Sequence, residues 1–138
     1  MFIRLIIFKS LKIVNNSDEK INIERVLSAN VDFTTDEFDF IQLSGSWGRE
    51  RHILRNPLRS GSQAIESRRG ASSHAQNPFM ALCSKDTNEE YGDVYGFSLV
   101  YSGNFLANVE VDKYRNARAQ IGINPFDFKW LLESKEEF

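Results

Sequence analysis

The sequence is poor in the residues that mark a metal centre, a disulfide framework or a nucleic-acid surface. Its one cysteine, Cys83, excludes an intramolecular disulfide, and its two histidines form no close pair of metal ligands. The 17 Lys and Arg residues are balanced by 19 Asp and Glu residues, so no excess of basic charge attracts nucleic acid or an anionic membrane. We expect no cofactor, no nucleic-acid or membrane partner, and a reducing, cytoplasmic location.

No hydrophobic run is long enough to cross a bilayer. The apolar start, residues 2–8, is interrupted by Arg4 and followed by Lys9, and it is far shorter than the roughly 20 residues that a spanning helix needs. It also lacks a small-residue cleavage site behind an apolar core, which argues against a signal peptide. A β-strand is the better prediction for this segment.

Length and composition fit one globular domain. The 138 residues are 41% hydrophobic and 26% charged, enough to bury a core. No stretch keeps a 3.6-residue period and no internal repeat is visible, whereas period-two alternation recurs along the chain. The prediction is an all-β, antiparallel β-sandwich.

Alternation is clearest in the last third of the chain. Apolar residues at every second position predict strands over 95–101, 105–111 and 117–123, joined by the short polar links 102–104 and 112–116. Such links favour antiparallel neighbours, so we expect a three-stranded meander. Its inward side chains would be Phe105, Ala107, Val109, Val111, Ala117, Ala119, Ile121 and Ile123, with Asn104, Asn108, Glu110 and Asp112 facing out.

The first half of the chain repeats this pattern less regularly. Residues 11–14 and 21–33 flank a run of turn formers and predict a hairpin, and a short strand is expected over 38–43. Residues 47–63 carry Gly, Pro, Arg and Ser without a steady period, so a mostly irregular connection is expected there. The polar tract 84–93 predicts a surface loop.

The segment SRRGASSHAQNPF, residues 67–79, concentrates polar side chains between short strand-like runs. Such residues either orient a polar ligand or tie down a complicated turn. Arg68 and Arg69 suit carboxylates and backbone carbonyls as well as substrate oxygens, and pairing at a domain interface is the favoured role. We expect His74 and Asn77 to support the connection by hydrogen bonds to nearby backbone, with Asn77 preceding a proline.

The adjacent Ser72, Ser73 and His74 do not predict a nucleophile. A catalytic triad needs a base whose ring reaches the serine and an acid that orients the base, and neighbours in sequence rarely have that geometry. Turn chemistry is the preferred interpretation.

Trp47 is the strongest candidate for ligand binding. A flat indole stacks on the apolar face of a pyranose, and its N–H donates to a hydroxyl or carbonyl oxygen. The alternative, that Trp47 caps the core or a domain interface, stays open. Arg49 is a weaker candidate for contact with sugar hydroxyls, because the alternating Arg-Glu-Arg of residues 49–51 is more typical of a solvated or ion-paired segment.

Four segments together resemble a known family. They are LSGSWGRERHI (43–53), SRRGASSHAQNPF (67–79), VYGFSLVYSGNFLANVEVD (94–112) and IGINPFDFKWLL (121–132). In this order they resemble the non-catalytic N-terminal domain of the α-galactosidases of glycoside hydrolase family 36, in clan D, and in particular the bacterial enzymes that cleave melibiose and raffinose. The resemblance begins near residue 11 and is weakest before it.

The resemblance implies that residues 1–138 are part of a single N-terminal β-sandwich domain, an incomplete super-sandwich with long irregular loops. In the family the catalytic (β/α)8 barrel and a small C-terminal β domain follow, and both catalytic aspartates lie in the barrel. No Asp or Glu of this chain stands in such a motif, so we nominate no catalytic residue. We expect a chain that is inactive alone, whether it comes from a truncated reading frame, a gene remnant or an expressed piece.

For the site, the resemblance places the tryptophan of the GxWxRER segment, Trp47 here, at the edge of the pocket formed with the barrel. Family members also form homotetramers, so domain packing and oligomer contacts are expected, and the aromatic residues within 124–130 are assigned to packing or docking. Two alternatives stay open. The chain is either a non-catalytic interaction module for the rest of its enzyme or an autonomous galactoside-binding β-sandwich.

Overall fold

The computed structural model describes residues 5–72 and 74–138, and these are built from strands without a helix. The described residues form ten strands: β1 (Ile21–Ile23), β2 (Ala29–Phe33), β3 (Phe38–Ser46), β4 (Arg49–Pro57), β5 (Gly61–Glu66), β6 (Gln76–Ser84), β7 (Val94–Ser98), β8 (Phe105–Val111), β9 (Ala117–Ile123) and β10 (Trp130–Leu132). The predicted all-β architecture is confirmed. Within the same residues, no helix exists that could cross a membrane.

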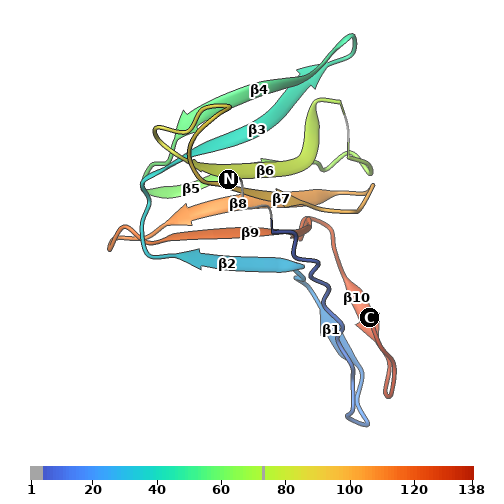
Figure 1. Ribbon diagram of the computed structural model, residues 1–138. Coiled ribbons are helices and arrows are strands. Elements are labelled where there is room, and N and C mark those ends of the chain that lie inside the picture. Colours follow the sequence, from blue (N-terminus) through green and yellow to red (C-terminus); the bar gives the residue numbers. More distant parts are fainter. Residues whose placement is uncertain (1–4, 73) are drawn as a thin grey trace.

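The strands form two antiparallel four-stranded sheets and one separate pair. The sheet orders are β4-β3-β6-β7 and β2-β9-β8-β5, and β1 pairs with β10. Figure 1 shows the first sheet above the second, while β1 and β10 extend away from both as an arm. The chain passes between the sheets four times, after β2, β4, β5 and β7. The polar connection of residues 67–75 is one of these passages.

The core lies between the inner faces of the two sheets. From β8, Phe105 and Val109 are fully buried, and they belong to one apolar cluster with Phe40 of β3 and with Met80 and Leu82 of β6. Successive side chains of a strand point to opposite faces, so alternate residues reach this layer. Burying each large side chain contributes about 1.5–3 kcal/mol, which makes the layer the main source of stability.

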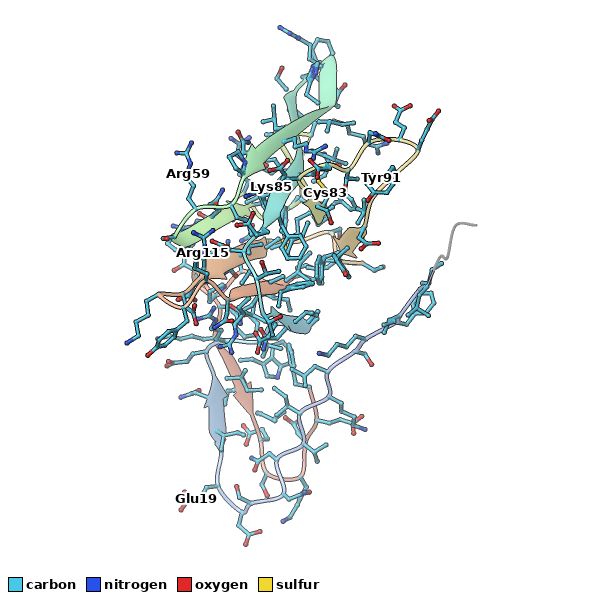
Figure 2. The ribbon with its side chains drawn as sticks, turned by 60° about the vertical axis from the view of Figure 1, so that its left-hand side comes forward. Glu19, Arg59, Cys83, Lys85, Tyr91 and Arg115 are labelled. Carbon is cyan, nitrogen blue, oxygen red and sulfur yellow. The ribbon has the colours of Figure 1, made fainter. Side chains whose placement is uncertain are left out.

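Ion pairs join the two sheets at one end of the sandwich. Lys85, from the loop after β6, and Arg115, from the turn after β8, both contact Glu37 in the connection between β2 and β3. Arg115 also lies 2.9 Å from the carboxylate of Asp36, which is buried. Figure 2 shows Lys85 and Arg115 in this region, and Glu19 far from them at the tip of the arm. The pairs are mostly exposed, so they contribute little stability each.

A buried asparagine closes the arm. The side-chain amide of Asn15 donates to the backbone carbonyls of Glu19 at 2.7 Å and of Leu132 at 3.2 Å. Backbone hydrogen bonds from Ile13 to Phe138 and back continue the contact between the two ends of the chain. The arm therefore depends on residues more than a hundred positions apart.

A second buried asparagine, Asn124, ties the connection after β5 to the end of β9. Its Nδ2 lies 2.9 Å from the carboxylate of Glu66 and 3.2 Å from the backbone carbonyls of Ser67 and Phe105. Its Oδ1 accepts the backbone N–H of Phe126 at 3.0 Å. The carbonyl of Phe105 also accepts the backbone N–H of Ser67 at 3.0 Å, so the asparagine adds a second donor there and supplies one to the carbonyl of Ser67 beyond the end of β5.

The predicted meander is wrong at its first strand. β8 and β9 pair as expected, but β7 pairs with β6 in the opposite sheet. Period-two alternation shows which face of a strand is buried and does not identify the neighbouring strand, so the six-residue link 99–104 was mistaken for a hairpin turn. The expected inward faces of β8 and β9 are confirmed, except that Ile123 is only partly buried, and Asn108, expected to face out, is buried in the central strand.

The predicted N-terminal hairpin is also wrong. β1 pairs with β10, β2 pairs with β9, and Val14 forms a bridge to Glu137. The true partners lie at the other end of the chain, where local patterns give no signal. Of the strand predicted over residues 2–8, residues 2–4 lie outside the described part, and residues 5–8 are exposed and in no strand because they have no partner.

Residues 47–63 were expected to be irregular, yet they include β4 and the start of β5. Every residue of β4 is exposed, on both of its faces, so the strand carries no alternation for the sequence to reveal. Its backbone pairing with β3 is what makes it a strand. The strand predicted over 38–43 and the loop predicted over 84–93 are confirmed.

We predict that Asn124→Ala lowers the free energy of unfolding by about 1–3 kcal/mol, because it removes the side-chain donor to the buried carbonyl of Ser67 and the acceptor for the N–H of Phe126. Urea denaturation followed by circular dichroism measures the change. Asn56→Ala, at an exposed position of β4, is the control and should stay within about 0.5 kcal/mol of the parent. Equal effects of the two substitutions would contradict a structural role for Asn124.

Candidate functional site

The β3–β4 hairpin presents Trp47 at its tip. Ser46 pairs with Arg49, so Trp47 and Gly48 form a two-residue turn. Gly48 has a φ of 75°, a conformation that favours glycine at the second central position of a tight turn. The indole of Trp47 is 87% exposed. Figure 1 shows this tip at the opposite end of the molecule from the arm.

A β-bulge lies directly below the tip. Ser44 pairs with His52 and Ser46 with Arg49, so the two β4 residues Glu50 and Arg51 oppose the single residue Gly45. Arg51 has a φ of 58°, an uncommon value for a residue with a side chain. A Cβ at Gly45 would lie 2.2 Å from the carbonyl oxygen of Arg49. Only glycine fits this close approach of the two strands.

Glu50 closes the turn from the bulge. Its Oε1 accepts the backbone N–H of Gly48 at 2.8 Å. This hydrogen bond, with the N–H of Glu50 itself, holds the pKa of the carboxyl below its usual value, and the positive charges of His74 and Arg51 lower it further. The carboxylate is therefore the form that holds the turn at neutral pH.

The end of the connection between β5 and β6 meets the hairpin just below its tip. The N–H of Gly45 donates to the carbonyl of Ala75 at 3.1 Å, and the hydroxyl of Ser44 donates to Gln76 at 3.1 Å. Here three residues of β6, 77–79, oppose one residue of β3, so Pro78 sits at an irregularity where it interrupts no regular ladder.

The two polar motifs that the sequence suggested separately therefore come together. An open depression of about 540 Å³ beside the tip is lined by Glu50 and Arg51 of the hairpin and by His74 and Asn77 of the connection. The Nδ2 atom of Asn77 is buried and has no hydrogen-bond partner among the described residues. His74 and Asn77 thus lie at the hairpin, and the support of nearby backbone assigned to them stays a prediction.

Arg68 and Arg69 lie elsewhere. The Nε of Arg68 is 2.9 Å from the carboxylate of Glu66, and its guanidinium stacks 4.5 Å from the ring centre of Phe126. The backbone N–H of Arg69 points to Ser67, and both arginine side chains are exposed. Neither arginine lines the depression, so their assignment to an interface stays a prediction.

Arg49 and Cys83, which were also considered in the sequence analysis, are not among the residues that line the depression. Arg49 is exposed next to the turn, where its backbone pairs with Ser46. Ser73 lies outside the described residues, so the adjacent Ser-Ser-His motif is not described in full. No group of three or more His, Cys, Asp or Glu side chains in residues 5–72 and 74–138 is arranged to hold a metal ion. Cys83 is fully buried, and burial raises the pKa of its thiol.

Sequence reasoning missed Gly45 and Glu50. The signal was present in the pair of glycines that brackets Ser46 and Trp47, which is typical of a tight turn with a close strand crossing. The tight turn was not predicted because residues 49–57 show no alternation of apolar and polar side chains that would indicate a partner strand.

The fold and the hairpin together define the class of protein domain: an antiparallel β-sandwich with an exposed tryptophan at a rigid hairpin tip. Residues 4–133 match the model of the glycosyl hydrolase family 36 N-terminal domain. The chain belongs to this family.

Close relatives support the assignment. The chain is 56% identical over 133 residues to the α-galactosidase AgaA of Geobacillus stearothermophilus and 41% identical over 135 residues to the α-galactosidase Mel36A of Lactobacillus acidophilus. These matches cover 96% and 98% of this chain but 18% of each relative. A crystal structure of an AgaA variant in complex with raffinose superimposes with a TM-score of 0.92 at 57% identity, over 94% of this chain and 18% of that one.

We predict that Gly45→Ala destabilises the chain by about 1–3 kcal/mol, because the added methyl group forces the backbones of β3 and β4 apart. Thermal unfolding and the NMR shifts of residues 44–52 measure the effect. Gly96→Ala is the matched control, since its Cβ would lie 3.7 Å from the ring of Phe79, an ordinary contact. A Gly45→Ala chain as stable as Gly96→Ala would contradict the proposed close crossing.

Proposed function

We propose that this chain is the N-terminal β-sandwich segment of a retaining α-galactosidase, and that it supplies one edge of the substrate pocket. The parent enzyme would hydrolyse terminal α-galactosyl residues in sugars of the melibiose and raffinose type. The membership in family 36 and the α-galactosidases among its relatives support this proposal. The chain alone, 18% of the length of these relatives, is proposed to be inactive.

The observation that carries the proposal is the exposed indole of Trp47 on a braced turn. A tryptophan that is 87% exposed gains little from the core of its own domain, and an indole face suits the apolar face of galactose. The raffinose complex of the Geobacillus enzyme supports a sugar of this type as the ligand. Arg49, exposed beside the turn, is proposed to contact sugar hydroxyls.

We further propose that other exposed surfaces dock on the catalytic barrel and on neighbouring copies in an oligomer. Leu5, Ile6, Ile7 and Phe8 are each at least 77% exposed, and Val100 is fully exposed. Apolar surface of this kind is typical of protein contacts. A cytoplasmic location is proposed from the single, buried cysteine.

A hybrid enzyme tests the function. In it, this chain replaces the 133 matched residues of the Geobacillus stearothermophilus α-galactosidase. We predict that the hybrid hydrolyses raffinose and that Trp47→Ala raises its KM by about tenfold, because a lost stacking contact costs roughly 1–1.5 kcal/mol. Tyr114→Ala removes an exposed aromatic side chain from the turn between β8 and β9 and should leave KM unchanged.

The isolated chain provides the second part of the test. It should show no turnover of an aryl α-galactoside, and calorimetric titration with raffinose should give no heat. Saturable raffinose binding by the chain alone, lost in Trp47→Ala, would instead establish an autonomous sugar-binding domain. An active hybrid whose KM is indifferent to Trp47→Ala would leave only a docking role.

A further inference from the structure

We propose that Glu50 is a positioning residue, which fixes the turn that presents Trp47 to the galactoside. That Glu50 fixes the turn is argued from the geometry of this chain. That the fixed turn improves sugar binding rests on the proposed function. Glu50 does not contact the sugar in this proposal. It acts by restricting the conformations of residues 47 and 48.

The turn needs an acceptor that the sheet does not provide. Ser46 and Arg49 form the last pair of the β3–β4 ladder, so the N–H of Gly48 lies beyond it. Glycine is the most flexible residue, and a turn with a free N–H at this position samples many conformations. The carboxylate of Glu50, 2.8 Å from this N–H, gives it a charged partner, and such hydrogen bonds are stronger than neutral ones.

The bulge explains why Glu50 reaches the turn. In a regular hairpin, a residue directly after the closing pair would point its side chain to one face of the ladder. The extra residue in β4 and the contact at Gly45, whose Cβ position lies 2.8 Å from the Cα of Glu50, fix a different direction for the side chain. The unusual φ of Arg51 is a consequence of the same bulge.

The contacts of Glu50 also distinguish this role from an ordinary surface ion pair. Arg49 and Arg51 flank it in the sequence, yet within the described residues no cation lies within 4 Å of its carboxylate. Its carboxylate accepts the backbone N–H of Gly48 in the turn. The pKa of this carboxyl is lowered mainly by the backbone hydrogen bond from Gly48, and nearby cationic side chains add to the effect.

Amide hydrogen exchange of Gly48 tests the positioning role in the chain itself. Loss of a hydrogen bond to a charged group should speed the exchange of this N–H by about tenfold or more in Glu50→Ala. Glu50→Gln retains an acceptor oxygen and should restore most of the protection. Glu90→Ala, at an exposed position of the 84–93 loop, should change nothing. Unchanged exchange at Gly48 in a folded Glu50→Ala chain would overturn the proposal.

The hybrid enzyme separates this inference from the proposed function. We expect Glu50→Ala to raise the KM for raffinose severalfold with kcat nearly unchanged, and Glu50→Gln to bring KM back. If Trp47→Ala raises KM and Glu50→Ala does not, the positioning role is overturned while the function stands. If Gly48 exchange responds to Glu50→Ala but neither substitution moves KM, the sugar-binding part of the proposed function is overturned, and Glu50 holds a turn that does not serve sugar binding.

Discussion

The register of β3 between β4 and β6 is the constraint on which the rest of the structure depends. Phe38 and Phe40 point into the core from this strand, and a slip by one residue would turn both toward solvent. That cost fixes the pairing of β3 with β6, and the close approach of the two strands at Gly45 fixes the hairpin turn at Trp47 and Gly48. The pairing of β3 with β6 brings residues 74–77, at the start of β6, to the hairpin just below its tip.

This constraint also changes how the polar segment 67–79 is understood. Its first half is a passage between the sheets, braced against the segment that follows β9 by Asn124 and by the stacking of Arg68 on Phe126. Its second half runs along the hairpin and completes the depression next to Trp47. The motif thus supports two structures, the passage between the sheets and the hairpin. These structural roles account for its polar composition without any ligand contact by its arginines or serines.

Burial determines how much of this could be predicted from the sequence. Strands whose inner face lies in the core, such as β8 and β9, were predicted with their inward residues, because alternation is the signature of one buried face. β4 escaped prediction because it is exposed on both faces, and the arm because its partners lie at opposite ends of the chain. Trp47 stood out as a residue type. The bulge, the contact at Gly45 and the reach of Glu50 depend on backbone geometry that residue types alone do not reveal.

In the proposed function, the exposed indole on its braced tip completes a site on another part of the enzyme. The most direct measurement is a crystal structure of the hybrid α-galactosidase with raffinose bound. The indole plane of Trp47 should lie against a face of the sugar within about 4 Å, with the turn closed by Glu50 as it is in this chain. An indole turned to solvent, or packed on protein with no sugar in contact, would contradict the central role assigned to the hairpin.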